Sequence, residues 1–229
     1  MAMCPMQQIK AGGLKYFRWN SVRGWRRWLL ITGVAGLVFW LLVPSLRFDR
    51  PYSSVLEDRD GKLLGARVAA DGQWRFPPAE SVPDRFESAI LAYEDRWFYW
   101  HPGVNPVSIL SAVYDALFTD LPRRGGSTIS MQLARLHYGA KERNMAAKLV
   151  EVAMAFKAEM MYSKKSLLAM YVAHAPFGGN VVGLEAASWR YFGQQPARLT
   201  WAESAALAVL PNSPALVFPG KNEAIFLRK

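Results

Sequence analysis

The chain has 229 residues, of which 28 are Lys or Arg and 18 are Asp or Glu, so its net charge is +10. This length accommodates one globular domain with an additional segment, and a hydrophobic content of 52% excludes a disordered chain. A single cysteine, Cys4, excludes an internal disulfide framework and a multi-cysteine zinc site. A strongly basic chain raises the question of nucleic-acid binding, so the location of the charge matters.

Much of the positive charge lies in residues 1–27, which contain six basic residues and no acidic one. The run from Trp28 to Leu46 follows directly and carries no charge. As a helix it would span about 28 Å, close to the hydrocarbon thickness of a bilayer. A cleaved signal peptide is the alternative, but it would have a shorter apolar region and a small-residue exit. The sequence therefore predicts a cytoplasmic basic arm over 1–27 that contacts anionic lipid rather than nucleic acid, and one transmembrane anchor over 28–46.

Residues 47–80 form the predicted linker outside the membrane, with a short β-hairpin in it. Val55 to Leu64 contains Asp60-Gly61, which supplies the positive φ of a tight turn. Asp58 and Asp60 also match the metal-binding dyad of nucleotide-sugar glycosyltransferases. The turn accounts for Asp60, and no glycine-rich Rossmann loop follows, so the hairpin is the favoured interpretation.

The pattern becomes helical from residue 81, and 81–229 is predicted to be one mostly α domain. Apolar residues from Met145 to Met160 recur every three or four positions, which predicts the most amphipathic helix of the chain. That apolar stripe either packs in the core or contacts a membrane surface, as does the aromatic run Trp97 to Trp100. Helices are expected to begin near Ser81, Asn105, Ser127, Met145 and Thr200.

Three segments carry polar residues that helix packing alone does not require. Glu94 and Asp95 end an apolar helix among aromatics, which suits a general base with a raised pKa but also a solvated helix end. Arg123 to Arg135 contains two glycines and two hydroxyls at a helix start, which suits an anion cradle or an ordinary capped loop. Lys148 and Glu151 share one helix face, either in a site or as a surface ion pair.

Read together, these segments resemble the motifs of the peptidoglycan glycosyltransferases of family 51, the polymerase domains of class A penicillin-binding proteins. Glu94 to Gly103 matches the whole first motif, and Gly125 to Gln132 matches the second with Ser130 in place of threonine. The third motif keeps Lys148 and Glu151, with Ala147 where the family prefers arginine. The fourth is looser: Lys164 and Tyr171 match, but Ala169 and Ala173 replace the usual acid and asparagine. Later segments resemble the class C subtype.

This resemblance implies a lysozyme-like bilobal fold and an enzyme that polymerises lipid II into β-1,4 glycan strands. It implies that Glu94 is the general base and that Glu151 acts near the pyrophosphate, where it either orients a lysine or holds a divalent cation. No cofactor is expected to be obligatory, and Mg²⁺ is the candidate cation. It places substrate-binding groups at Asp95, Phe98, His101, Ser127, Thr128, Gln132, Arg135 and Lys148, to which we add Arg124 from its place in the predicted anion cradle. For His101 a structural role at the helix end is favoured over proton transfer.

The implied location is the bacterial inner membrane, with a single span, a cytoplasmic N-terminus and the catalytic domain outside. The implied partners are lipid II, the growing glycan strand, the membrane and other cell-wall synthesis proteins, and no nucleic acid. Two other functions stay open: a catalytically weak assembly scaffold, because of Ala147 and Ala173, and a lysozyme-like glycan-cleaving enzyme. The transpeptidase motifs Ser-x-x-Lys and Lys-(Thr/Ser)-Gly are absent from the sequence. The similarity of the later segments to the class C subtype favours the interpretation that this chain is a piece of a bifunctional protein rather than a monofunctional enzyme.

Overall fold

The computed structural model describes residues 17–79, 81–108, 110, 126–139 and 144–212. The chain divides into two units, Met1–Pro44 and Ser45–Lys229. The described part of the first unit is essentially one helix, α1 (Phe17–Leu42), whose apolar side chains are exposed from Trp28 onward. The helix ends before Pro44, because proline lacks an N–H group and disfavours helical geometry in the preceding residue. Within the described residues, no helix combines the length and the apolarity needed to cross a membrane. The predicted transmembrane span over 28–46 is therefore not confirmed.

The second unit begins with the predicted hairpin. Strands β1 (Ser54–Glu57) and β2 (Leu63–Arg67) pair antiparallel, with an irregularity between Leu56 and Glu57. Asp58 Oδ1 accepts hydrogen bonds from the backbone N–H groups of Asp60 and Lys62, at 2.9 and 2.8 Å. Asp58 thus stabilises the turn by itself, so the turn explains this carboxylate and a metal dyad is not needed.

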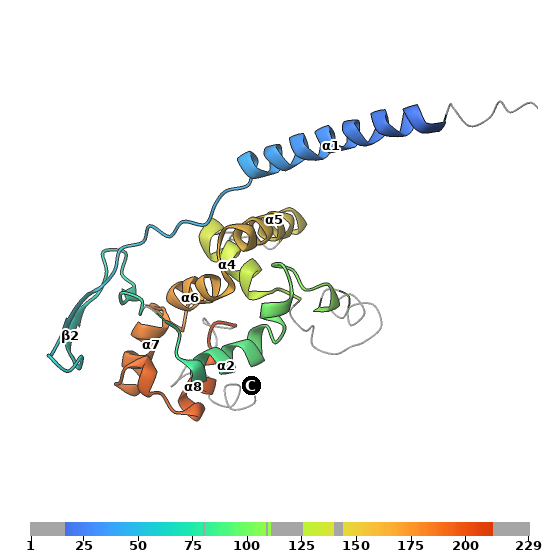
Figure 1. Ribbon diagram of the computed structural model, residues 1–229. Coiled ribbons are helices and arrows are strands. Elements are labelled where there is room, and N and C mark those ends of the chain that lie inside the picture. The colour runs from blue at the N-terminus through green and yellow to red at the C-terminus, as the bar shows by residue number, and fades with distance from the viewer. Residues whose placement is uncertain (1–16, 80, 109, 111–125, 140–143, 213–229) are drawn as a thin grey trace, which may run out of the picture. The chain divides into compact units, whose positions relative to one another are not determined.

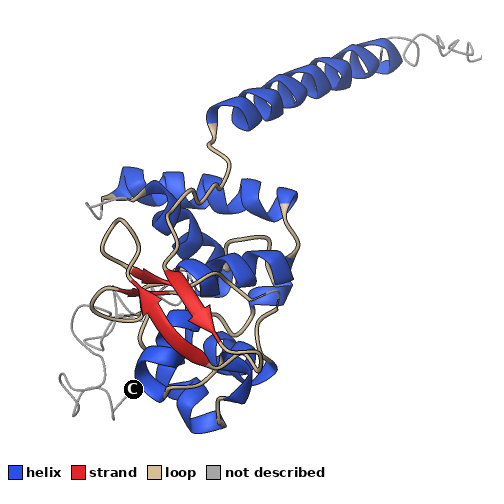
Figure 2. Cartoon of the chain, turned by 90° about the vertical axis from the view of Figure 1, so that its left-hand side faces the viewer, coloured by secondary structure: helices blue, strands red, loops and turns tan. Residues whose placement is uncertain are grey.

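A second, shorter strand pairing was not predicted. Strands β3 (Trp74–Arg75) and β4 (Val181–Val182) pair in parallel, although they lie far apart in the sequence. Arg75 is buried and donates to the carbonyl oxygen of Pro51 (2.7 Å) and to Asp71 (3.0 Å). This arginine therefore connects the start of the unit to the strand pair. Figure 2 shows the strands in red with the helices of this unit.

The remaining elements are helical, as predicted. They are α2 (Asp84–Glu94), η1 (Phe98–Trp100), α4 (Ile129–Tyr138), α5 (Met145–Met161), α6 (Lys164–His174), α7 (Leu184–Phe192), η2 (Pro196–Arg198) and α8 (Trp201–Ala208). Helix α4 packs against both α5 and α6, and α2 packs against α8 (Figure 1). The apolar core between them includes Phe86, Ile90, Met131, Leu133 and Leu167, all with no exposed surface. The unit is therefore mostly helical around a closely packed core.

The helix starts agree with the sequence in part. Thr200 and Glu203 form the predicted capping box at α8, and Asn105 Oδ1 accepts from the N–H groups of Val107 and Ser108. The predicted cap at Ser81 is wrong, because α2 begins at Asp84 after Pro83 and has no side-chain cap. Pro83 is the N-cap residue, with φ −63° and ψ 137°, an extended conformation that is usual at this position. Most of the helix predicted after Asn105 lies outside the described residues.

Helix α5 presents its apolar stripe to the outside. Met145, Leu149, Phe156 and Met160 are 78%, 67%, 43% and 59% exposed. Its buried face holds Met154 and two alanines together with the charged residues Glu151 and Lys157. Core packing, one of the two interpretations of this stripe, is therefore wrong for these four residues.

Candidate active site

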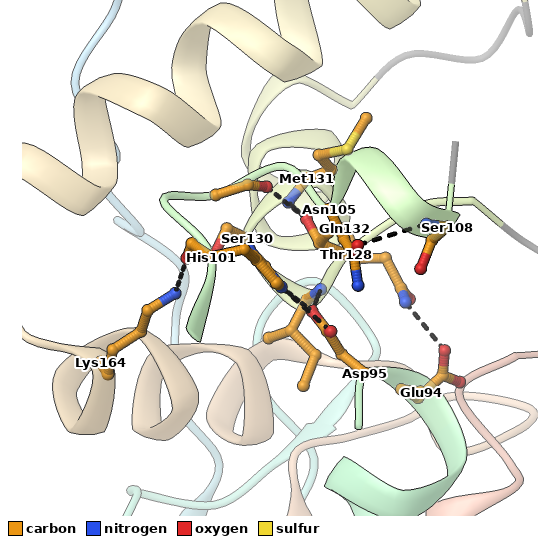
Figure 3. A network of polar contacts seen from close by, with 12 residues as sticks. Glu94, Asp95, His101, Asn105, Ser108, Thr128, Ser130, Met131, Gln132 and Lys164 are labelled. Atoms are coloured by element: carbon orange, nitrogen blue, oxygen red, sulfur yellow. Dashed lines mark hydrogen bonds and ion pairs between the residues drawn. The ribbon is translucent and has the colours of Figure 1, made fainter. Parts of the chain in front are cut away.

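The first two motifs are joined by a group of side chains that we call the buried network: Asp95, His101, Thr128, Glu159 and Lys164. Asp95 follows the last residue of α2, and both its carboxylate oxygens lie 3.0 Å from His101 Nε2 (Figure 3). Asp95 Oδ2 also accepts a hydrogen bond from the N–H of Ile129, the first residue of α4. An aspartate at this helix end satisfies a free backbone donor and the positive end of the helix dipole.

Thr128 makes the second connection between the motifs. Its hydroxyl donates to the carbonyl oxygen of Gly103 and accepts from the N–H of Met131, at 3.2 Å, as the N-cap of α4. Gly103 has a φ of +87°, and a Cβ there would lie 3.1 Å from the backbone of Ala155 in α5. Glycine is therefore required where the end of the first motif passes between α4 and α5.

Lys164, from the fourth motif, closes the buried network. Its Nζ donates to the carbonyl oxygen of His101 (2.6 Å) and to Glu159 Oε1 (2.7 Å), and lies 4.4 Å from the centre of the Phe98 ring. Ser130 donates to the same Glu159 oxygen at 2.6 Å and has no exposed surface. Sequence reasoning missed Glu159, because no motif contains it. Four predicted substrate-binding residues are buried: Phe98, Asp95, His101 and Thr128. Their burial indicates that they support the structure of the site. Their contact with substrate stays a prediction.

Glu94 lies beside this network but is bonded differently. Its Oε2 accepts from Gln132 Nε2 at 2.8 Å, and Gln132 Oε1 accepts from the Tyr171 hydroxyl at 3.1 Å. The amide of Gln132 is thus fixed from both ends and orients the Glu94 carboxylate. Burial raises the pKa of Tyr171 well above its ordinary value, and the charge of Glu94 raises it further. The phenol therefore stays protonated and remains a donor to Gln132. Tyr171 is a site residue that our sequence-based selection omitted, although the fourth motif contains it.

Four residues form what we call the cationic cluster: Ser127, Arg135, Lys148 and Glu151. Arg135 donates to Glu151 Oε1 from Nε (2.7 Å) and to Oε2 from its terminal nitrogen (3.1 Å). Lys148 Nζ donates to Glu151 Oε2 at 3.1 Å and to the hydroxyl of Ser127. The predicted placement of Lys148 and Glu151 on one helix face is confirmed.

The charges of the cationic cluster follow from these contacts. Burial would raise the pKa of Glu151, but the hydrogen bonds from Arg135 and Lys148 outweigh it and hold the pKa below its ordinary value. The pKa of Arg135 is raised by its hydrogen bonds to Glu151. Two cations and one carboxylate leave one net positive charge, and the side chains of Arg135 and Lys148 are 33% and 35% exposed. The cluster can therefore bind an anion that arrives from solvent.

Helix α4 connects Glu94 with the cationic cluster. Gln132, which bonds to Glu94, and Arg135, which bonds to Glu151, are three residues apart on α4 and therefore share one face of it. A carboxylate that can accept a proton and cations that can stabilise a leaving anion thus belong to one site. Arg124 lies outside the described residues.

The donor set does not fit a divalent cation. Both oxygens of Glu151 are already engaged by Arg135 and Lys148. The described residues contain no group of three or more His, Cys, Asp or Glu side chains that could hold a metal ion. The proposed binding of Mg²⁺ by Glu151 therefore finds no support in the side chains around it.

The departures from the family pattern lie at two different places. Ala147 lies three residues after Asn144, whose side chain caps α5 by accepting from the Ala147 N–H at 2.7 Å. Ala169 and Ala173 line a small cavity beside Glu185 and Gly183. A Cβ on Gly183 would lie 2.6 Å from the carbonyl oxygen of Ala173, so the chain passes closely at this point.

Comparisons with known proteins agree with the motifs. A family model described as Transglycosylase matches residues 60–229. Penicillin-binding protein 1C of Escherichia coli (strain K12) is 41% identical over 168 residues, which are 73% of this chain and 22% of that protein. Penicillin-binding protein 1A of Aquifex aeolicus (strain VF5) is 32% identical over 207 residues, and penicillin-binding protein 1F of Bacillus subtilis (strain 168) 36% over 176. These matches cover 83% and 75% of this chain, and 28% and 24% of those proteins.

The chain thus spans about a quarter of the length of the curated relatives that it matches. The family model, by contrast, covers most of this chain and includes all the residues of the buried network and the cationic cluster. The chain therefore belongs to the transglycosylase family, the peptidoglycan glycosyltransferases of penicillin-binding proteins that its motifs resemble.

Proposed function

We propose that this domain polymerises lipid II, a disaccharide-pentapeptide carried on undecaprenyl pyrophosphate, with Glu94 as the general base. The observation that carries the proposal is the pairing of an oriented carboxylate with a cationic cluster along one face of α4. Transfer of a sugar from a pyrophosphate carrier needs both groups: one accepts a proton from the attacking hydroxyl, and the other stabilises the leaving anion. Family membership supports the same substrate class.

The proposed reaction is a single displacement. Glu94 takes the proton from the 4-hydroxyl of the acceptor lipid II, and that oxygen attacks C1 of the terminal sugar of the growing strand. A β-1,4 bond forms with inversion as the bond from C1 to the pyrophosphate oxygen breaks. Arg135 and Lys148 stabilise the departing undecaprenyl pyrophosphate. Glu151, ionised between these two cations, positions them rather than holding a metal.

The scaffold and glycan-cleaving functions are less well supported. A catalytically weak assembly scaffold does not need the hydrogen bonds that join Glu94, Gln132 and Tyr171. A hydrolase of glycan releases no pyrophosphate and has no use for a cationic cluster. The lysozyme-like two-lobed arrangement stays a prediction, since the described residues establish a mostly helical unit.

Membrane attachment is part of the same proposal, because the carrier of the substrate is a lipid. We propose an inner-membrane location in which the exposed apolar residues of α1 from Trp28 to Leu42 and the exposed stripe of α5 contact the bilayer. Flotation of the second unit alone, from Ser45 onward, with vesicles of anionic lipid tests the contact of α5 without the first segment. Binding should weaken when Leu149 and Met160 are both replaced by glutamate. Unchanged flotation of this variant would argue against the role of α5.

The catalytic assignment is tested with Glu94→Gln, which keeps the shape of the side chain and its contact with Gln132. Lipid II polymerisation should fall by at least about 10²-fold, as is usual when a general base is removed. The matched control is Glu87→Gln, on the same helix but bonded to Tyr99, which should polymerise normally. Near-normal turnover of Glu94→Gln would refute the assignment.

A further inference from the structure

A groove of about 590 Å³ lies among the hairpin, residues 76–79, 81 and 83, and the segments α7 and η2. No residue of the buried network or the cationic cluster lines it. Its lining includes two aromatic residues, Phe76 and Trp189, and the four prolines Pro77, Pro78, Pro83 and Pro196. These rings offer apolar surface on which the aliphatic part of a ligand can pack.

The hairpin wall of the groove is fixed at its tip. Gln195 Nε2 donates to the carbonyl oxygen of Gly61 at 2.7 Å, and Gly61 has a φ of +73°. A Cβ at Gly61 would lie 2.5 Å from the same nitrogen. The positive φ favours glycine at this turn, and the hydrogen bond from Gln195 holds the hairpin beside η2.

Two carboxylates line this groove. Glu57 comes from β1 and Glu185 from the first turn of α7. Burial raises the pKa of Glu185 to about 7, and the charge of Glu57 adds to the effect. Among the described residues that line the groove, no basic side chain accompanies them. The groove therefore combines apolar walls with negative charge that has no counter-ion in its lining.

We propose that this groove binds a peptide segment of a partner protein and that a lysine side chain of the segment lies between Glu57 and Glu185. The ammonium group is compact and has three donors, so it can bond to both carboxylates at once. The four methylene groups of lysine can pack on Phe76 and Trp189, and the ring of Trp189 adds a favourable contact for a cation. Charge complementarity thus selects the occupant, and the prolines and aromatic rings hold its apolar part.

The test uses the full chain in detergent micelles with ¹³C-labelled glutamate carboxyl groups, observed by NMR. The Glu185 resonance is identified as the one lost in Glu185→Gln. The probe is N-acetyl-lysine methylamide, and its neutral counterpart has norleucine in place of lysine. We expect the lysine probe, and not the norleucine probe, to move the Glu185 titration midpoint to lower pH. The lysine probe should also bind roughly tenfold more tightly at pH 8 than at pH 6, since the ionised fraction of Glu185 rises about tenfold.

Two variants make the outcome decisive. Glu57→Gln should abolish most of the response, and Asp49→Asn, which removes an exposed carboxylate outside the groove, should leave it unchanged. Glu94→Gln should also leave it unchanged, so a failure of the proposed polymerase activity and a failure of this site are separate results. Equal responses to both probes would show an apolar groove without selection for a cation. No response at about 50 mM lysine probe, well above a millimolar affinity, would overturn the proposal as well.

Discussion

The buried network and the cationic cluster meet at the start of α4, yet they differ in exposure and in charge balance. In the buried network Asp95, His101 and Thr128 are almost inaccessible, and Asp95 bonds to both His101 and the first turn of α4. In the cationic cluster Arg135 and Lys148 remain about one-third exposed and outnumber their carboxylate. The first set is bonded within itself, whereas the second keeps charge available for a ligand.

The comparison shows that neighbouring residues of one motif serve different purposes. Glu94 belongs with Gln132, whereas Asp95 turns into the buried network. Ser127 contacts Lys148, whereas Thr128 caps α4 and bonds to Gly103. In both motifs the first residue of the pair belongs to the site and the second holds the motifs together.

The largest expected effect concerns the two lysines, which the comparison assigns to different sets. Lys148→Ala should reduce lipid II polymerisation by about 10² to 10³-fold, as when one stabilising contact to a developing anion is removed. Its free energy of unfolding should change by less than about 0.5 kcal/mol, because the side chain is partly exposed.

The control is Lys164→Ala, measured in the same polymerisation and denaturation assays. Lys164 is bonded to His101 and Glu159 within the buried network, so its loss should lower stability more than Lys148→Ala does. Equal, small losses of activity in both variants would show that Lys148 is only a surface charge.

The next effect is on stability. Asp95→Ala removes the buried partner of His101 and of the Ile129 N–H, and should lower the free energy of unfolding by about 3 kcal/mol. Urea denaturation followed by circular dichroism measures this change. If the variant were stable but had lost polymerisation, Asp95 would be a catalytic group rather than part of the buried network.

The smallest effect concerns Glu185, a carboxylate without a cation in the lining of its groove. Its pKa is raised to about 7 in the folded chain, above the ordinary value, so the folded state binds the proton more tightly. The stability from this group is complete below about pH 4.5 and is lost as the pH rises through 7. The free energy of unfolding should therefore fall between about pH 5 and pH 8, and fall less in Glu185→Gln. Equal slopes in denaturation series of both proteins would contradict the raised pKa.

The sequence was informative about local structure and about the family. The hairpin, the capping box of Thr200 and Glu203, and the helix face shared by Lys148 and Glu151 are all confirmed. Each depends on residues only a few positions apart, where turn geometry and helix periodicity decide the outcome. The motifs also led to the correct family.

What the sequence could not provide depends on long-range packing. Periodicity identified the apolar stripe of α5 but not its direction, because the pattern is the same whether the stripe faces core or solvent. The contacts of Lys164 with His101 and of Gln132 with Tyr171 join residues far apart in the sequence. The pairing of β3 with β4 involves only two residues on each side, too few to leave a pattern of alternation.

That strand pair also has a consequence for synthesis on the ribosome. Trp74 and Arg75 emerge long before Val181 and Val182, with which they pair. Closing so long a segment is entropically unfavourable until the helices between them have collapsed, so this ladder should form late. During that interval the backbone groups of the early segment are unpaired, which leaves them open to wrong pairing with other strands.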